Sequence, residues 1–237
     1  SRYVLINDIK LNNSSNWQYW NSAPPTNTWT PIGKGYTFSG VFNGNGFTIA
    51  GIYTNSATQR AGLFGYVSGT IINLGIEQSY IMGSSYVGSI VGYLNGGQVN
   101  NCYNTGFVYG ANYAGGIVGY GGGTIMNNYN AGTVIASYAG GGIVGICPSN
   151  SIVLCNYYLT GSSIGVAGSG TVSANNRSFS PDGTLREASS PFSLLPITLG
   201  GVSRTTLLDA LNALIDMDML PMSCLRWSET SGFPMFL

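Results

Sequence analysis

Short apolar stretches, separated by glycine and polar residues, return along the middle of the chain every 26 or 27 residues. Each period opens with two apolar residues closed by a glycine, and two further short runs rich in β-branched and aromatic residues follow. Runs of this kind favour β-strands joined by tight turns. The closing glycines that mark the period are Gly65, Gly92, Gly119 and Gly145. A fixed period of this size indicates a repeat architecture.

We therefore predict an all-β fold, a right-handed parallel β-helix or solenoid with coils of about 27 residues and three strands. A helical repeat is excluded because glycine interrupts every apolar pattern of helical spacing between Phe38 and Thr171. Glycine makes up 36 of 237 residues, which is about twice the usual ~7%. We expect much of this glycine to occupy corners with positive φ.

The composition changes near residue 177, where charged residues return. We predict a β-solenoid over 1–176, with an aromatic entry region at its start, and a C-terminal cap over 177–237. One short helix is expected at about 206–217, since Thr206 is a typical N-cap and leucines then recur at helical spacing. The predicted apolar face of this helix comprises Leu207, Leu208, Leu211, Leu214 and Ile215.

Charge limits the chemistry that the coils can perform. The chain has 8 Lys and Arg, 8 Asp and Glu and no histidine, and only Arg60 and Glu77 are charged between Lys34 and Arg177. Acid–base catalysis and metal binding need titratable groups placed together. We therefore expect no enzyme activity, no catalytic residues, no cofactor and no metal. The zero net charge also argues against nucleic acid as a partner, and no apolar run approaches the length of a membrane span.

Four cysteines leave two questions open. Cys102 and Cys155 fall on roughly equivalent positions two coils apart, about 9.6 Å at a strand spacing of ~4.8 Å, so a disulfide between them is not expected. Both are predicted to be buried. Cys147 and Cys224 could pair only if the C-terminal segment folds back onto the fourth coil.

Aromatic residues supply the candidate binding sites. Tyrosines recur in two columns and could form a platform of flat rings for a glycan or a protein, or could simply pack. Tryptophans in the entry loop could likewise bind a ligand, or could cover the open first coil. The candidate residues are Tyr66, Tyr93 and Tyr120 in one column, Tyr86, Tyr113 and Tyr138 in the other, and Trp17 and Trp20 in the loop.

The repeated phrase also predicts an interaction surface. Adjacent residues of a strand point to opposite faces, yet both positions of the phrase are apolar, so one column should face outward and need a cover. We expect either the C-terminal helix or a partner chain to cover it. The candidate column consists of Leu63, Ile90, Ile117 and Ile143.

Several segments together resemble the GLUG-repeat family. The similar segments are 7–11, 29–33, 38–49, 62–65, 101–106 and the ending from Trp227 to Pro234. The resemblance covers most of the chain and implies a β-solenoid in an extracellular, often bacterial, surface protein, including adhesin-like chains and non-catalytic regions attached to peptidases. Asn43 departs from it, because an aspartate is expected there.

Three functions follow as alternatives. The first is a non-enzymatic extracellular surface module, adhesin-like or presenting a ligand, whose partner is a glycan or a host or neighbouring surface protein. The second is a structural subunit that assembles with copies of itself into an extracellular filament, since the low charge leaves strand edges unprotected. The third is an accessory region of a larger secreted enzyme.

Overall fold

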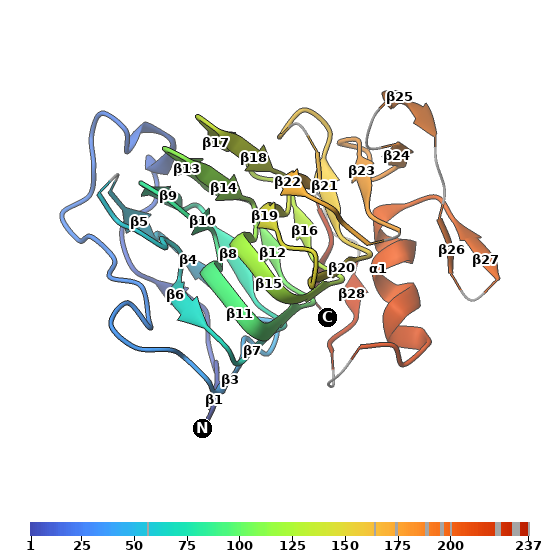
Figure 1. Ribbon diagram of the computed structural model, residues 1–237, viewed down its shortest axis with the longest axis horizontal. Helices are drawn as coiled ribbons and strands as arrows, with labels where there is room; N and C mark the ends of the chain where they lie inside the picture. The colour runs from blue at the N-terminus through green and yellow to red at the C-terminus, as the bar shows by residue number, and fades with distance from the viewer. Residues whose placement is uncertain are drawn as a thin grey trace.

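The computed structural model describes the chain except for residues 56, 164, 174, 188–189, 195–196, 200, 221–223, 229–232 and 237. The protein is a parallel β-solenoid of about five coils, followed by a cap that contains a short helix. Figure 1 shows the coils stacked from the β1 end to the β22 end, with the cap along one side. Among the described residues, no helix combines the length and the apolar character needed to cross a membrane.

Each coil contributes strands to long sheets that run along the solenoid. Sheet A contains β1 (Arg2–Val4), β3 (Val41–Asn43), β6 (Phe64–Val67), β7 (Thr70–Ile72), β11 (Val91–Asn100), β15 (Val118–Met126), β19 (Val144–Cys147), β20 (Ile152–Leu154) and β22 (Ala167–Gly170). Sheet B contains β2 (Ile9–Lys10), β4 (Thr48–Ala50), β8 (Gly75–Glu77), β12 (Tyr103–Asn104), β16 (Tyr129–Asn130), β21 (Tyr157–Leu159), β23 (Arg177–Phe179), β24 (Leu185–Glu187) and β25 (Ser190–Leu194).

Sheet C contains β5 (Tyr53–Thr54), β9 (Tyr80–Gly83), β13 (Phe107–Gly110) and β17 (Val134–Ala136). A shorter fourth sheet contains β10 (Val87–Gly88), β14 (Tyr113–Gly115) and β18 (Ala139–Gly141). The register follows the sequence period, since Tyr93 of β11 pairs with Tyr66 of β6 and Tyr120 of β15. The predicted parallel solenoid is thus confirmed, and the described coils carry the fourth short strand in addition.

The expectation that one column of the repeated phrase faces outward is wrong. Leu63, Ile90, Ile117 and Ile143 are all buried in the core, and so are their neighbours Phe64, Val91, Val118 and Val144. The alternation fails because the chain turns between the two positions. The carbonyl of Ile117 accepts from the amides of both Ile90 and Val91, at 3.1 and 3.2 Å. Consecutive amides that share one acceptor place both side chains inside the corner, so this column is core and not an interface.

Glycine supplies positive φ at several turns, among them Gly46, Gly51 and Gly96, as predicted, and asparagine supplies it at one corner of successive coils. Asn73, Asn101 and Asn127 occupy equivalent corner positions with φ of 53°, 55° and 57°, a region that asparagine tolerates better than most residues. The glycine that closes each phrase serves a different purpose. A Cβ on Gly92 would collide with the backbone of Arg60, and one on Gly119 would collide with the backbone of Tyr86. These glycines permit close approach between neighbouring segments of the coils.

The corner asparagines form a hydrogen-bonded ladder along the solenoid. Asn73 Nδ2 donates to Asn43 Oδ1 at 3.0 Å, Asn101 Nδ2 to Asn73 Oδ1 at 2.8 Å, and Asn127 Nδ2 to Asn101 Oδ1 at 2.9 Å. Asn43, where the GLUG resemblance leads one to expect aspartate, is therefore the first acceptor of this ladder. The ladder links adjacent coils at the same corner, and it ends at Asn127, whose buried Oδ1 has no hydrogen-bond partner among the described residues because Cys155 takes the next corner position.

The cap begins where the strand direction changes. Sheet B continues in parallel to β23, and β24 and β25 then add to it antiparallel. Two antiparallel pairs follow, formed by β26 (Ile197–Leu199) with β27 (Val202–Arg204) and by β28 (Trp227–Ser228) with β29 (Met235–Phe236). Helix α1 (Leu207–Asp216) lies between these pairs in the sequence and starts as predicted, because the Thr206 hydroxyl accepts from the Asp209 amide at 3.2 Å.

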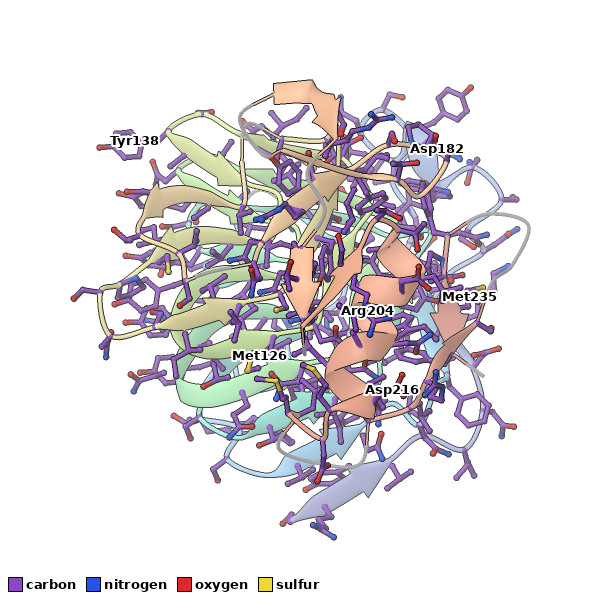
Figure 2. All side chains as sticks on the ribbon, turned by 90° about the vertical axis from the view of Figure 1, so that its right-hand side faces the viewer. Met126, Tyr138, Asp182, Arg204, Asp216 and Met235 are labelled. Carbon is purple, nitrogen blue, oxygen red and sulfur yellow. The ribbon has the colours of Figure 1, made fainter. Side chains whose placement is uncertain are left out.

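Helix α1 covers a different surface from the one expected. Its buried face packs with Tyr103, Tyr129 and Tyr157, which form the outer column of sheet B, and with Trp227. Figure 2 looks onto this cap, with α1 in front of the stacked strands. The asparagine ladder anchors the cap at two points. Asn127 Nδ2 donates to the Leu211 carbonyl in α1 at 3.0 Å, and Asn101 Nδ2 donates to the Leu225 carbonyl at 2.9 Å. The column that the cap covers is therefore the aromatic column of sheet B, and not the predicted column of Leu63, Ile90, Ile117 and Ile143.

The four cysteines are free thiols, so Cys147 and Cys224 do not pair. Cys102 and Cys155 are buried, as expected, but they are not equivalent. Cys155 has φ of 52° and takes the corner position of Asn127, whereas Cys102 follows the corner residue Asn101 and lies in the solenoid core.

Candidate functional site

A column of tyrosines lies on the outer side of sheet A. Tyr66, Tyr93 and Tyr120 are half-buried and occupy the same register in β6, β11 and β15. Their rings are stacked, with centroids 4.9 Å apart at 11° between the first two and 4.2 Å apart at 4° between the last two. The column ends at Ile146, which pairs with Tyr120 in the next coil.

A second column runs beside the first. Tyr86 and Tyr113 are stacked at 5.6 Å and 8°, and Tyr86 also meets the rings of Tyr93 and Tyr120 edge-on at 5.5 and 5.7 Å. The two predicted columns therefore meet in one surface. We call Tyr66, Tyr86, Tyr93, Tyr113, Tyr120 and Arg60 the tyrosine patch.

Arg60 is the member of the patch that the sequence analysis missed. The bridge between Gln59 and Ser85 places Arg60 in register with Tyr86, and both residues have positive φ, 51° and 54°. The Arg60 guanidinium lies 5.3 Å from the ring centroid of Tyr66 and 5.5 Å from that of Tyr93, within the range of a cation–π contact. The signal was present in the spacing, since residues 60, 86 and 113 are 26 and 27 apart.

Tyr138 does not belong to the second column as predicted. Ala139 pairs with Tyr113, so Tyr138 is displaced by one residue, which the shorter step of 25 residues reflects. Its ring meets Tyr113 edge-on at 5.3 Å and is 75% exposed. Figure 2 shows Tyr138 projecting away from the body of the protein. It is an exposed aromatic neighbour of the patch.

Stacking determines what the patch can offer a ligand. Rings that lie face to face along the solenoid cover one another, so the inner rings present their edges and hydroxyls to solvent instead of their faces. The hydroxyls follow the strand spacing of about 4.8 Å. Each can donate one hydrogen bond and accept others. The patch is therefore a row of regularly spaced polar groups held by rigid rings, with one cation at its N-terminal end.

The raised pKa values of several tyrosines predict how the stability of the protein depends on pH. Burial, followed by the Tyr120 hydroxyl, raises the pKa of Tyr93 to about 12, and burial raises the pKa of Tyr103 and Tyr129. The folded protein thus holds these protons more tightly than the unfolded chain, whose tyrosines titrate near about 10. Their contribution to the free energy of unfolding is complete below about pH 10 and should be lost as the pH rises towards about 12.

Urea denaturation at about pH 8 and about pH 11 measures this loss. Tyr103→Phe removes one of the buried phenols, so this variant should lose less stability between the two pH values than the wild-type protein. An equal loss in both proteins would contradict the assignment of Tyr103.

The entry-loop tryptophans do not form a free aromatic site. Trp20 is only 1% exposed and meets the ring of Tyr53 edge-on at 5.9 Å. Trp17, in the short 3-10 helix η1 (Trp17–Tyr19), is half-buried and lines a hollow of about 280 Å³ with Tyr80 and Phe107. The loop lies against the outer column of sheet C, along the side of the solenoid, and not over the open end of the first coil as the alternative expected.

The outer aromatic columns thus differ in what covers them. In the described part of the chain, the cap covers Tyr103, Tyr129 and Tyr157 on sheet B, and the entry loop lies against Tyr53, Tyr80 and Phe107 on sheet C. The tyrosines of the sheet A column pack against one another and against Arg60. They remain partly exposed, as do Tyr53 and Phe107 of sheet C. Sheet C supplied an aromatic column that the sequence analysis did not identify, although Tyr53, Tyr80 and Phe107 are 27 residues apart.

Comparisons with known proteins add evidence on the fold. Neither a protein-family model nor a curated protein sequence matches this chain. The chain is similar to a crystal structure described as that of a putative immunoglobulin A1 protease from Bacteroides ovatus, with a TM-score of 0.59 and 18% sequence identity, over 100% of this chain and 86% of that one. At this identity the likeness shows a shared fold alone.

Proposed function

We propose that this chain is a non-catalytic module of an extracellular surface protein that binds a glycan or a neighbouring surface protein through the tyrosine patch. One observation carries the proposal. The cap and the entry loop lie over the aromatic columns of sheets B and C, whereas the contacts of the partly exposed sheet A column in the described residues are with the neighbouring tyrosines and Arg60. A contiguous and partly exposed aromatic surface of this kind is a candidate interaction site.

The patch is also well suited to bind without rearrangement. Tyr93 is stacked between Tyr66 and Tyr120, and the strands beneath are paired on both sides over β11 and β15. Rigid side chains lose little conformational entropy when a ligand binds, and tyrosine combines an apolar ring with a polar tip. A regular row of hydroxyls fits an extended polar ligand, such as a glycan chain, better than a compact apolar one.

The chemistry of the patch supports binding without catalysis. It consists of phenol hydroxyls and one guanidinium, and it contains no carboxylate or imidazole. The pKa of Tyr93, about 12, places it further from neutrality than an ordinary tyrosine, whereas a general base works best with a pKa near the working pH. The resemblance to GLUG-repeat proteins supports the extracellular location, although part of its C-terminal motif, including Gly232, lies outside the described residues.

The hydroxyls of Tyr93 and Tyr120 should carry part of the binding energy. We expect the double substitution Tyr93→Phe with Tyr120→Phe to weaken binding by about thirtyfold, because each of the two lost hydrogen bonds contributes about 1 kcal/mol. The rings and their stacking remain, so the fold should be unchanged. A glycan array followed by titration calorimetry with the strongest ligand measures the effect.

Tyr3→Phe is the matched control for that experiment. Tyr3 is 51% exposed but lies in β1, outside the patch. Binding that is weakened equally by the control, or unchanged in the double variant, would remove the patch hydroxyls from the site.

Assembly into a filament is the second candidate function. The β1 edge favours it, because Tyr3 and Val4 are more than half exposed on a terminal strand of sheet A. Two observations weigh against it. The apolar column expected to drive assembly is buried, and antiparallel β24 ends the parallel stacking of sheet B. Light scattering over a range of concentrations separates the candidates, since fibres would favour assembly and a monodisperse monomer the binding module.

The third alternative is an accessory region of a larger secreted enzyme. The name of the Bacteroides ovatus protein is compatible with it, but a likeness at this identity carries no argument about activity. The open reading frame around this chain is the direct test.

A further inference from the structure

A hollow of about 410 Å³ opens beside the tyrosine patch. Its wall is formed by the entry segment around Trp29 to Lys34 and by the turn that leads to Arg60. The segment is held in place as part of the first coil, since the Trp29 amide donates to the Tyr53 carbonyl at 2.7 Å and its indole to the Leu63 carbonyl at 3.1 Å. The volume falls within the range of about 300–1,000 Å³ that is usual for small-molecule sites.

The hollow is positively charged in a chain with no net charge. Lys34 and Arg60 both line it and are exposed, and none of its described lining residues is acidic. The sequence from Ile9 to Ile76 contains no aspartate or glutamate at all. Two neighbouring cations without a nearby carboxylate create a local potential that attracts an anion.

Arg60 connects the hollow to the patch. It lines the hollow, and its guanidinium lies over the rings of Tyr66 and Tyr93. Its position in the coil is the one that Tyr86 and Tyr113 occupy further along, so arginine replaces tyrosine where the column meets the hollow. The cation–π contacts orient the guanidinium but leave its charge available to an anion, because a ring supplies no negative charge.

We propose that the hollow binds the carboxylate of an acidic sugar, and that the glycan continues from there along the hydroxyls of the tyrosine patch. This inference rests on the proposed function and names the class of ligand. Arg60 would bind the carboxylate with paired hydrogen bonds, a geometry that guanidinium favours, and Lys34 would add a second charge. The amides of Asn55 and Gln59 and the hydroxyl of Thr58, which also line the hollow, suit the hydroxyls of a sugar ring.

The test compares acidic glycans with neutral counterparts of the same rings. Titration calorimetry at low salt would use a galacturonic-acid tetrasaccharide with its methyl ester, and sialyllactose with its methyl ester. We expect at least one acidic member to bind about tenfold or more tightly than its neutral counterpart, the range of a charge-assisted hydrogen bond. Raising the salt concentration should reduce this preference, because both cations are exposed.

Two substitutions test whether Arg60 and Lys34 cause the preference for acidic over neutral glycans. Arg60→Gln and Lys34→Gln should each remove most of it, and Lys34 serves as the second variant because it does not share the positive φ of Arg60. Arg2→Gln is the charge-matched control, since Arg2 is exposed in β1 and does not line the hollow. Circular dichroism and thermal unfolding check that each variant is folded.

The outcomes separate this inference from the proposed function. Equal binding of acidic and neutral glycans, with sensitivity to Tyr93→Phe and Tyr120→Phe, would overturn the acidic site and leave the patch intact. A preference that survives Arg60→Gln and Lys34→Gln would also overturn it. Tighter binding of an acidic peptide such as hexaglutamate than of either acidic glycan would overturn the sugar assignment. Binding to none of the glycans on an array would overturn the acidic site and count against the patch as a glycan site.

Discussion

Replacing Asn101 by alanine is expected to lower the free energy of unfolding by about 3–5 kcal/mol, because several buried polar groups lose a partner at about 1–3 kcal/mol each. The Asn101 side chain makes four hydrogen bonds. Its Nδ2 donates to Asn73 Oδ1 at 2.8 Å and to the Leu225 carbonyl at 2.9 Å, and its Oδ1 accepts from Asn127 Nδ2 at 2.9 Å and Trp227 Nε1 at 2.7 Å. Alanine removes all four and leaves the buried indole N–H of Trp227 without this acceptor.

The backbone adds a second cost. Asn101 has φ of 55°, and most residues other than asparagine and glycine lose about 1–2 kcal/mol in this region. Asn101→Gly removes the same hydrogen bonds without the backbone strain, so it should be less destabilising than Asn101→Ala by about 1 kcal/mol. Asn95→Ala, at an exposed position, should stay within about 0.5 kcal/mol of wild type. Urea denaturation of the three variants measures these differences, and an effect of Asn101→Ala no larger than that of Asn95→Ala would refute the ladder's role.

The period of the apolar residues was sufficient to predict the solenoid. Parallel coils require equivalent residues to lie one above another, so pairs such as Tyr93 and Tyr120 are visible in the sequence as a step of 27. The helix was predictable for a similarly local reason, because the Thr206 cap and the leucine spacing act within a few residues.

The corners could not be predicted from composition. Glycine supplies positive φ at some turns, as expected, but Asn73, Asn101 and Asn127 do so at one corner of successive coils, while Gly92 and Gly119 make room for backbone atoms of another segment. The burial of both Ile90 and Val91 has the same kind of origin, since it depends on two amides that turn towards one carbonyl. Such contacts connect residues that alternation along a single strand does not describe.

The site was predicted in part. The sequence showed which tyrosines share a column, but it did not show that two columns meet, that Arg60 joins them, or that Tyr138 is displaced. These depend on the register at the turns, where one residue changes the side that a ring faces. It also could not show which column the cap would cover, because Tyr129 on sheet B and Tyr120 on sheet A are similar in sequence terms and differ only in what packs against them.

Trp227 is the residue on which the covering of sheet B depends most. It is buried, its ring stacks on Phe236 at 4.2 Å, and it contacts the rings of Tyr103 and Tyr129 at centroid distances of 6.0 and 5.4 Å. Its backbone pairs with α1, because its amide donates to Asn212 Oδ1 at 2.9 Å. We expect Trp227→Ala to destabilise the cap by about 3–5 kcal/mol, as is usual for a buried tryptophan.

Trp227→Ala should destabilise the cap without affecting glycan binding at the tyrosine patch. Release of the cap would expose the aromatic column of sheet B, so the variant should be cleaved by protease within 180–237 and should self-associate in light scattering. Trp227→Phe keeps an aromatic ring but loses the indole N–H that donates to Asn101, so it should show both effects more weakly. Trp17→Ala, at a half-buried loop position, should leave the cap intact. The tyrosine patch lies on another sheet, so glycan binding by Trp227→Ala should persist as long as the coils remain folded. Loss of binding without loss of the coils would mean that the cap, and not the open column of sheet A, holds the ligand.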